Sequence, residues 1–197
     1  MASETIGAVL AGGRSSRMGT PKALVELAGR PLISYPLAAV VEAGLEPVVV
    51  AKPETELPEL DCEVLREPEQ PTHPLLGILT ALRRYEGRAL VAIACDLPFV
   101  SPDLVRALAG AEERLVVCEG GGRLQPLLGR YEPSLAGELE AAIERGDSAH
   151  GTARALGGRI VGEAELSNFG PPERLLFNVN DPRDLAEAGR LAAGGPD

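Results

Sequence analysis

Short apolar runs alternate with amphipathic stretches along this chain. Continuous apolar runs are typical of strands buried on both faces of a sheet, and apolar positions at helical spacing are typical of helices. The strands predicted in this way are residues 5–10, 47–51, 62–65, 88–95, 115–118, 124–128, 159–161 and 175–177. The predicted helices are residues 31–43, 75–85, 101–108, 133–145, 147–156 and 182–191.

The order of these elements predicts the fold class. Strands that alternate with helices form an α/β sandwich with a mostly parallel sheet. Residues 88–95 form the most continuous apolar run, so we place them at the centre of the sheet. The chain contains no repeat, low-complexity block or long linker, so residues 1–197 are expected to form a single domain with 192–197 as a loose tail.

Composition narrows the classes of protein. The formal charge of −10 disfavours binding to nucleic acid or to an acidic membrane. Because no apolar run is long enough to span a membrane and the first residues lack a signal-peptide pattern, we expect a cytoplasmic protein without a membrane segment. The cysteines are three and widely spaced, which favours buried thiols over disulfides or a zinc site.

Residues 10–22 form the first loop with candidate chemistry, since ligands bind beyond the carboxyl ends of parallel strands. Its glycines let backbone N–H groups approach phosphate oxygens, and Arg14, Arg17 and Lys22 supply positive charge. The loop matches neither the Walker A nor the dinucleotide pattern. A glycine-rich turn with solvated arginines is the alternative. Since Lys52 is the only other lysine of the chain, the position of Lys22 favours phosphate binding.

Two further loops follow predicted strands. Asp96 ends the central run and is well placed to hold Mg²⁺, although a turn or helix cap explains an aspartate there equally well. Residues 177–182 offer two asparagines and a carboxylate, and an N-terminal cap of the last helix is their alternative role. His73 and His150 show no pattern of a catalytic pair, so we expect structural or surface roles for both.

Three motifs in order are Leu-Ala-Gly-Gly-Arg-Ser-Ser-Arg-Met-Gly with Lys22, Cys-Asp-Leu-Pro-Phe, and Asn-Val-Asn-Asp-Pro-Arg-Asp-Leu. Together they resemble the molybdenum cofactor guanylyltransferases, the MobA family of nucleotidyltransferases, from about residue 6 to residue 185. The resemblance implies a Rossmann-like three-layer sandwich of the nucleotide-diphospho-sugar-transferase type. It also implies Mg²⁺-dependent transfer of GMP from GTP to the phosphate of Mo-molybdopterin, with release of pyrophosphate.

The resemblance also implies roles for individual residues. Those expected to bind the nucleotide are Leu10, Ala11, Gly12, Gly13, Lys22 and Glu67, where Glu67 stands at a position that is often aspartate in relatives. Lys22 and Arg17 are expected to hold the departing phosphates, Asp96 the Mg²⁺, and Asn178 and Asn180 the acceptor. Transient contacts with cofactor-synthesis proteins or molybdoenzymes are expected. The chain departs from the family at Gln125-Pro126, where many relatives carry His-Pro, and at Asp181, where threonine is usual.

Other functions remain open at this point. A related cytidylyltransferase or sugar-phosphate nucleotidyltransferase differs in base or acceptor, and such relatives more often begin Leu-Ala-Ala-Gly. A nucleotide-binding regulatory domain without catalysis and a purely structural module are alternatives of another class. Retention of both Lys22 and Asp96 favours catalysis, in which an acceptor phosphate oxygen attacks the α-phosphorus in line without a general base.

Overall fold

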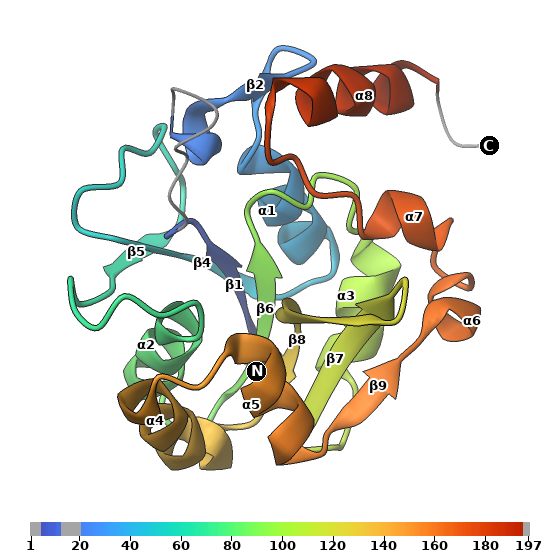
Figure 1. Ribbon diagram of the computed structural model, residues 1–197. Helices are drawn as coiled ribbons and strands as arrows, with labels where there is room; N and C mark the ends of the chain where they lie inside the picture. Colours follow the sequence, from blue (N-terminus) through green and yellow to red (C-terminus); the bar gives the residue numbers. More distant parts are fainter. Residues whose placement is uncertain (1–4, 13–20, 195–197) are drawn as a thin grey trace.

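A computed structural model describes residues 5–12 and 21–194 of the chain (Figure 1). A seven-stranded sheet runs through it in the order β5-β4-β1-β6-β8-β7-β9. Its strands are β1 (Thr5–Leu10), β4 (Glu46–Ala51), β5 (Glu63–Arg66), β6 (Ala89–Ala94), β7 (Leu115–Gly120), β8 (Arg123–Tyr131) and β9 (Arg159–Val161). All of these pair in parallel except β8, which is antiparallel to both β6 and β7. The mostly parallel sheet is as predicted.

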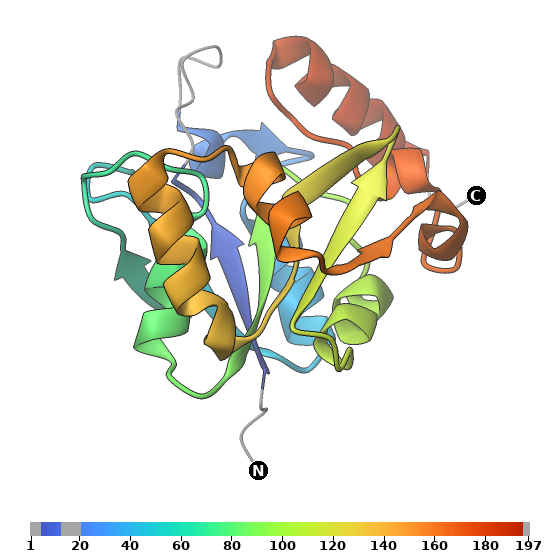
Figure 2. The same cartoon turned by 60° about the horizontal axis from the view of Figure 1, so that its bottom comes forward.

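Helices cover both faces of the sheet and complete three layers (Figure 2). One face packs against α1 (Ser34–Glu42) and α3 (Pro102–Ala109). The other packs against α2 (Leu76–Arg84), α4 (Ala136–Arg145) and α5 (Ala149–Leu156). The remaining helical segments are α6 (Glu163–Leu166), α7 (Pro172–Leu175), α8 (Pro182–Ala193) and the 3-10 helices η1 (Lys22–Leu24) and η2 (Pro133–Leu135). The predicted three-layer sandwich is therefore confirmed.

The continuous apolar runs are explained by this double coverage. In β6, Val91 and Ile93 belong to the core on one face of the sheet, whereas Leu90 and Ala92 belong to the core on the other. Side chains of a strand alternate between faces, so a strand covered on both sides must be apolar at every position. As predicted, β6 occupies the middle of the sheet, between β1 and β8.

The position of β1 creates a switch point in the sheet. The chain adds β4 and β5 on one side of β1 and then returns to add β6 on the other side. Leu10 and Ala94, the last residues of β1 and β6, are register partners. The chains that leave these two strands diverge from neighbouring points, which is where open α/β sheets bind ligands.

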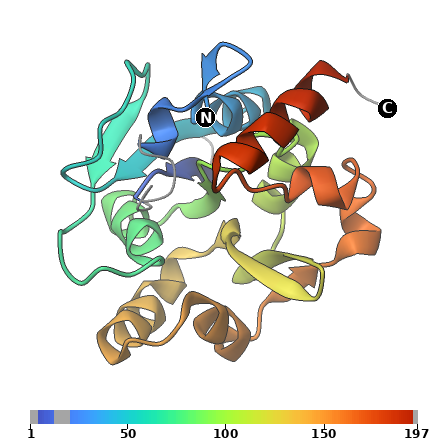
Figure 3. The same cartoon turned by 45° about the horizontal axis from the view of Figure 1, so that its top comes forward.

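A small accessory layer lies beside the carboxyl edge of the sheet. It consists of the hairpin β2 (Glu26–Leu27) and β3 (Arg30–Pro31), with α8 packed beside it (Figure 3). A separate apolar cluster joins these parts through four fully buried residues, Leu27, Leu32, Val179 and Ala188. The hairpin follows Lys22 directly in sequence, so this layer connects the chain around Lys22 with the last helix.

Several predicted boundaries differ from the structure. The helix expected over residues 31–43 begins only at Ser34, because residues 26–31 form the hairpin. Residues 175–177, predicted as a strand, instead contain the end of α7 and the loop after it, since Pro171 and Pro172 begin a helical turn whose Leu175 packs into the core. The last helix continues to Ala193, beyond the predicted end at 191. Within the described residues, no helix is long and apolar enough to cross a membrane.

Candidate active site

A pocket of about 870 Å³ opens at the carboxyl ends of β1, β4 and β6. Its lining brings together residues from distant parts of the sequence. They include Leu10, Gly12, Lys22, Lys52, Glu67, Thr72, His73, Gly77, Asp96, Arg123, Gln125, Ser148, His150, Asn178 and Asn180. The volume is near the upper end of the range for small-molecule sites.

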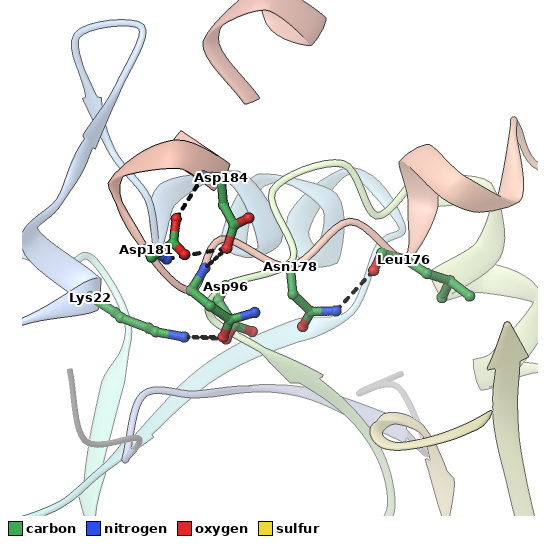
Figure 4. Close-up of polar contacts among 7 residues, drawn as sticks. Lys22, Asp96, Leu176, Asn178, Asp181 and Asp184 are labelled. Atoms are coloured by element: carbon green, nitrogen blue, oxygen red, sulfur yellow. Dashed lines mark hydrogen bonds and ion pairs between the residues drawn. The ribbon is translucent and has the colours of Figure 1, made fainter. Parts of the chain in front are cut away.

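Lys22, Asp96 and Asn180 form the polar centre of this pocket. The Lys22 Nζ atom lies 2.7 Å from Asp96 Oδ2 and 2.8 Å from Asn180 Oδ1. Figure 4 shows the Lys22 side chain reaching Asp96 from η1. The two charged side chains are only 13% and 16% exposed, so their attraction is screened less than that of a surface pair. The ammonium group is thereby fixed beside the end of the central strand.

The Asp96 carboxylate keeps one oxygen unused. Its Oδ1 atom is buried and has no hydrogen-bond partner among the described residues. A buried charged oxygen without a partner is costly, so its position calls for a ligand that supplies positive charge or a donor. No group of three or more His, Cys, Asp or Glu that could hold a metal occurs in the described residues.

Backbone hydrogen bonds fix the loop that carries Asp96. The N–H of Cys95 donates to the carbonyl of Leu10 at 3.0 Å, which extends the β1–β6 pairing past the strand ends. The N–H of Val179 donates to the Asp96 carbonyl at 2.9 Å. The segment around Val179 is thus bonded to the loop after β6, although it lies far away in sequence. This bond brings Asn178 and Asn180 to the same side of the pocket.

Glu67 and Lys52 add two buried side chains of opposite charge to the pocket lining. Both are buried, with Glu67 6% and Lys52 8% exposed. Burial raises the pKa of the Glu67 carboxyl, and the positive charge of Lys52 opposes that rise. The Lys52 Nζ atom lies 3.5 Å from Thr72 Oγ1. The carboxylate and the ammonium together offer a ligand both an acceptor and a donor.

Two glycines make room for the Glu67 side chain. A Cβ at Gly12 would lie 2.7 Å from Glu67 Oε1, and a Cβ at Gly77 would lie 3.3 Å from Glu67 Oε2. Any larger residue at Gly12 would collide with the carboxylate or displace it. The glycine after the first strand therefore accommodates a neighbouring side chain, in addition to any backbone approach to phosphate.

The start of α8 is built around two aspartates, which Figure 4 shows above the Lys22–Asp96 pair. Asp181 Oδ1 accepts from the N–H groups of Arg183 and Asp184 at 2.8 and 3.0 Å. Asp184 Oδ2 accepts from the N–H groups of Asn180 and Asp181 at 2.8 and 3.2 Å. This is a capping box. The cap role considered for residues 177–182 is therefore present, together with the placement of Asn180 in the pocket.

Other predicted residues fall in different places. Asn178 lines the pocket, and its Nδ2 donates to the Leu176 carbonyl at 2.9 Å. Leu10 lines the pocket, whereas Ala11 packs in the core and its N–H donates to the Val50 carbonyl at 2.8 Å. Gly13 and Arg17 lie outside the described residues, as does Arg14.

The sequence did not single out Lys52, Arg123 or Gln125 as pocket residues. The rarity of lysine was a usable signal for Lys52, because the chain has only two lysines. Both of them line this pocket. Arg123 donates from Nε to His150 Nε2 at 3.3 Å, which requires that nitrogen to be unprotonated. No sequence pattern predicts this pair, since strand β8 and helix α5 meet only in the folded chain.

His73 has a structural role, as predicted, whereas His150 lines the pocket beside Arg123. Cys95 and Cys118 are buried as predicted, and Cys62 is partly exposed. His73 Nδ1 accepts from the Leu75 N–H at 3.1 Å, so Nε2 carries the proton and donates to the Asp147 carbonyl at 2.6 Å. Its ring therefore ties two loops of the pocket wall together. The cysteines are free thiols, and burial raises the pKa of Cys95 and of Cys118 to about 12. Such thiols are poor nucleophiles near neutral pH.

Known proteins resemble the chain over nearly its full length. Residues 7–161 match the family of MobA-like NTP transferase domains. The molybdenum cofactor guanylyltransferase of Cereibacter sphaeroides is 36% identical over 191 residues, covering 94% of this chain and 95% of that protein. The probable molybdenum cofactor guanylyltransferase of Pelotomaculum thermopropionicum is 31% identical over 196 residues, covering 96% and 94%.

A solved structure gives the same picture for the fold. The molybdopterin-guanine dinucleotide biosynthesis protein A of Archaeoglobus fulgidus superposes with a TM-score of 0.78 at 26% identity, over 95% of this chain and 98% of the other. The relatives in sequence and the relative in structure cover nearly the same part of this chain. The polar groups of the pocket lie at the carboxyl edge of its central sheet. The chain belongs to the family of MobA-like NTP transferase domains.

Proposed function

We propose that this protein transfers GMP from GTP to the phosphate of Mo-molybdopterin and releases pyrophosphate. The observation that carries the proposal is the buried Lys22–Asp96–Asn180 cluster at the switch point of the sheet. The names of its relatives, molybdenum cofactor guanylyltransferases with identities up to 36%, support this activity. The family membership makes the protein a nucleotidyltransferase, and the pocket supplies the groups that such a reaction needs.

The reaction exchanges one phosphorus–oxygen bond for another. An oxygen of the acceptor phosphate attacks the α-phosphorus of GTP in line, and the bond from that phosphorus to the β-phosphate oxygen breaks. The electron pair leaves with pyrophosphate. A phosphate nucleophile is already ionised near neutral pH, so the protein needs no general base and acts by orientation and charge neutralisation. The Lys22 ammonium is placed to neutralise charge on the departing phosphates.

The residues of the pocket fit Mg²⁺. Asp96 Oδ1 is buried without a partner among the described residues, and the amide side chains of Asn178 and Asn180 also line the pocket. Mg²⁺ is usually bound through one or two carboxylates together with phosphate oxygens and water. Asp96 would hold the ion, which when bound would neutralise negative charge on the phosphates. Lys22 contacts the carboxylate directly, and Asn180 Oδ1 accepts from the same ammonium group.

Glu67 and Lys52 support guanine as the base. Guanine presents two adjacent N–H donors and one carbonyl acceptor on its pairing edge, whereas adenine and cytosine each present a single donor group. A carboxylate accepts two hydrogen bonds side by side, and an ammonium donates to a carbonyl. Glu67 and Lys52 lie together in the pocket, held near the chain that leaves β1 by the space at Gly12. The predicted nucleotide contact at Glu67 thus has a physical basis.

The acceptor is assigned to the opposite part of the pocket. Arg123, Gln125 and His150 come from β8 and α5, and Asn178 and Asn180 also line the pocket. Arg123 has no carboxylate partner among the described ion pairs, so it is suited to a ligand with negative charge or acceptor oxygens. The predicted acceptor contacts at Asn178 and Asn180 and the contacts with molybdoenzymes stay predictions.

Thermal unfolding with Mg²⁺ and each of GTP, CTP, ATP and UTP tests the base, because a ligand that binds only the native state raises the melting temperature. We expect a shift with GTP alone, lost in Lys22→Ala and kept in Arg83→Ala, which removes an exposed cation outside the pocket. Pyrophosphate release with GTP and Mo-molybdopterin tests the transfer. A shift with CTP would indicate a cytidylyltransferase. A shift with GTP but no pyrophosphate release would indicate a nucleotide-binding regulatory domain. Turnover with a sugar phosphate in place of Mo-molybdopterin would indicate a sugar-phosphate nucleotidyltransferase.

A further inference from the structure

The first turn of α8 holds a residue of the pocket. Asp184 Oδ2 accepts from the N–H of Asn180 at 2.8 Å, and Asn180 Oδ1 accepts from Lys22 Nζ at 2.8 Å. Lys22 in turn lies 2.7 Å from Asp96. A chain of short contacts thus leads from the last helix to the carboxylate at the end of the central strand. The match to the family ends at residue 161, so this helix lies beyond it.

Helix capping alone does not account for Asp184. In a capping box the side chain of the third helical residue accepts from the N–H of the cap residue, here Asp181. That bond is present at 3.2 Å, but the shorter one, at 2.8 Å, goes to Asn180, the residue before the cap. The carboxylate is therefore placed to hold the backbone of Asn180 as well as to cap the helix.

The neighbouring residue fixes the other side of Asn180. Val179 is fully buried between the hairpin and α8, and its N–H donates to the Asp96 carbonyl at 2.9 Å. Val179 and the bonded Asn180 N–H constrain the backbone before the Asn180 side chain, and the Asp181 N–H, which also donates to Asp184 Oδ2, constrains it on the other side. The direction of its carboxamide toward Lys22 then follows from the backbone.

We propose that Asp184 is a positioning residue for the transfer reaction. It holds Asn180 so that the carboxamide oxygen orients the Lys22 ammonium between Asp96 and the phosphates of the nucleotide. The proposal rests on the function proposed above. Asp184 acts through Asn180 and is not among the residues that line the pocket, which makes its effect separable from that of a group that binds the phosphates directly.

A double-mutant cycle tests this path. The turnover number for pyrophosphate release is measured at saturating GTP, Mg²⁺ and acceptor for Asp184→Ala, Asn180→Ala and the double variant. We expect Asp184→Ala to lower the turnover number about tenfold, the scale of one hydrogen bond to a charged group. We expect no further loss when Asp184→Ala is added to Asn180→Ala. Effects that multiply, or an unchanged turnover number in Asp184→Ala, would overturn the proposal.

Two controls separate positioning from the stability of a helix. Asp184→Glu keeps a carboxylate that capping boxes commonly use, so it should restore most of the lost turnover. Ser101→Ala removes the cap of α3, where Ser101 Oγ accepts from the Leu104 N–H at 3.2 Å. That variant should lose comparable stability and keep its turnover number. A turnover loss in Ser101→Ala equal to that in Asp184→Ala would mean that reduced stability alone lowers activity.

Amide hydrogen exchange provides a measurement that does not depend on the reaction. In the ligand-free protein, Asp184→Ala should speed exchange of the Asn180 N–H about tenfold or more, whereas Ser101→Ala should leave it unchanged. An unchanged rate in an active enzyme would overturn only the role of Asp184. A wild-type protein that releases no pyrophosphate would instead overturn the function on which that role depends.

Discussion

At the scale of single residues, the described lining of the pocket balances its charges within an acidic protein, with Lys22, Lys52 and Arg123 against Glu67, Asp96 and Asp147. The chain has a formal charge of −10, yet both of its lysines and Arg123 line one pocket. Lys22 is paired with Asp96, and Lys52 lies within the electrostatic influence of Glu67. Local charges dominate inside a pocket because water screens them less there. A pocket whose charges balance repels an anion less than the overall charge of −10 suggests.

Replacing Asp96 by asparagine should separate catalysis from nucleotide binding. Asp96→Asn keeps the shape of the side chain and removes the charge that the pair with Lys22 and a bound Mg²⁺ require. We expect pyrophosphate release to fall about 100-fold or more, the scale on which a catalytic electrostatic group acts. The affinity for GTP without Mg²⁺, measured by calorimetry, should change less than about tenfold. Equal losses in affinity and rate would contradict this assignment.

Replacing Gly12 should disturb the Glu67 side chain. The added Cβ of Gly12→Ala would lie 2.7 Å from Glu67 Oε1, so the carboxylate must move. We expect a destabilisation of about 1–3 kcal/mol, the usual cost of overpacking, together with weaker GTP binding. Urea unfolding measures the first and calorimetry the second.

Gly137→Ala is the matched control for Gly12→Ala. Gly137 lies in α4 with no heavy atom within 4 Å of an added Cβ. This variant should be unchanged or more stable by about 0.4–1 kcal/mol, because alanine restricts the unfolded chain. If Gly12→Ala behaves like Gly137→Ala, Glu67 does not need the space at residue 12.

At the scale of elements, two loops and one late segment complete the site. The loops after β1 and β6 leave the sheet side by side, and the segment from Asn178 to Asn180 docks onto the loop after β6. That segment has little regular structure of its own, and the hairpin β2–β3 and α8 hold it through a separate small core. The accessory layer therefore holds the segment from Asn178 to Asn180 in place beside the pocket.

Val179→Ala should test the link between this small core and activity. Val179 is fully buried, and shortening it leaves a gap between the hairpin and α8. We expect a loss of about 1–2 kcal/mol in the free energy of unfolding and a several-fold lower turnover number. Val48→Ala, a fully buried residue of β4, should cost similar stability with turnover unchanged. Equal turnover losses in both variants would disprove a specific role for the small core.

The pattern of apolar residues predicted best the strands that are buried on both faces of the sheet. The strands β1, β4 and β6 were predicted within one residue at each end, because every position in them must be apolar. The hairpin β2–β3 was missed, since its two turn residues, Ala28 and Gly29, both have positive φ and alanine is rare in that conformation. Residues 175–177 were wrong because a short apolar run does not distinguish a strand from a buried helical turn.

The site was predictable only in part, because local patterns indicate where a loop lies but not how side chains from distant segments meet. Lys22 and Asp96 come after two neighbouring parallel strands, so their meeting at one edge follows from the sheet. Asn180 follows no strand, and the bond from the Val179 N–H to the Asp96 carbonyl brings it there. The pairs Lys52–Glu67 and Arg123–His150 depend on the directions of side chains across tertiary contacts. No local pattern encodes those directions. Gly13 and Arg17, outside the described residues, stay predictions.

At the scale of the whole molecule, the double-faced sheet buries thiols that should shape stability at alkaline pH. Cys118 is fully buried in β7, and burial raises the pKa of its thiol from 9.0 to about 12. Between these values the unfolded chain loses the proton and the native protein keeps it. The native state then binds more protons, so stability falls as the pH rises through this range.

Cys118→Ala should flatten that decline. The variant loses some core packing at pH 7, but its free energy of unfolding should fall less steeply between about pH 9 and 11, by about 1 kcal/mol per pH unit. Urea unfolding at intervals of half a pH unit measures both slopes. Parallel curves for the two proteins would show that the thiol of Cys118 does not contribute to the decline.

The 158-residue separation between Lys22 and Asn180 has a consequence for protein synthesis. A ribosome makes Lys22 early, whereas the segment that holds Asn180 and the helix behind it emerge after the last strand, β9, has been completed. Domains generally fold as units during synthesis. A nascent chain that has completed β9 but not residue 180 therefore lacks the contact between Lys22 and Asn180, whatever part of its sheet has already formed.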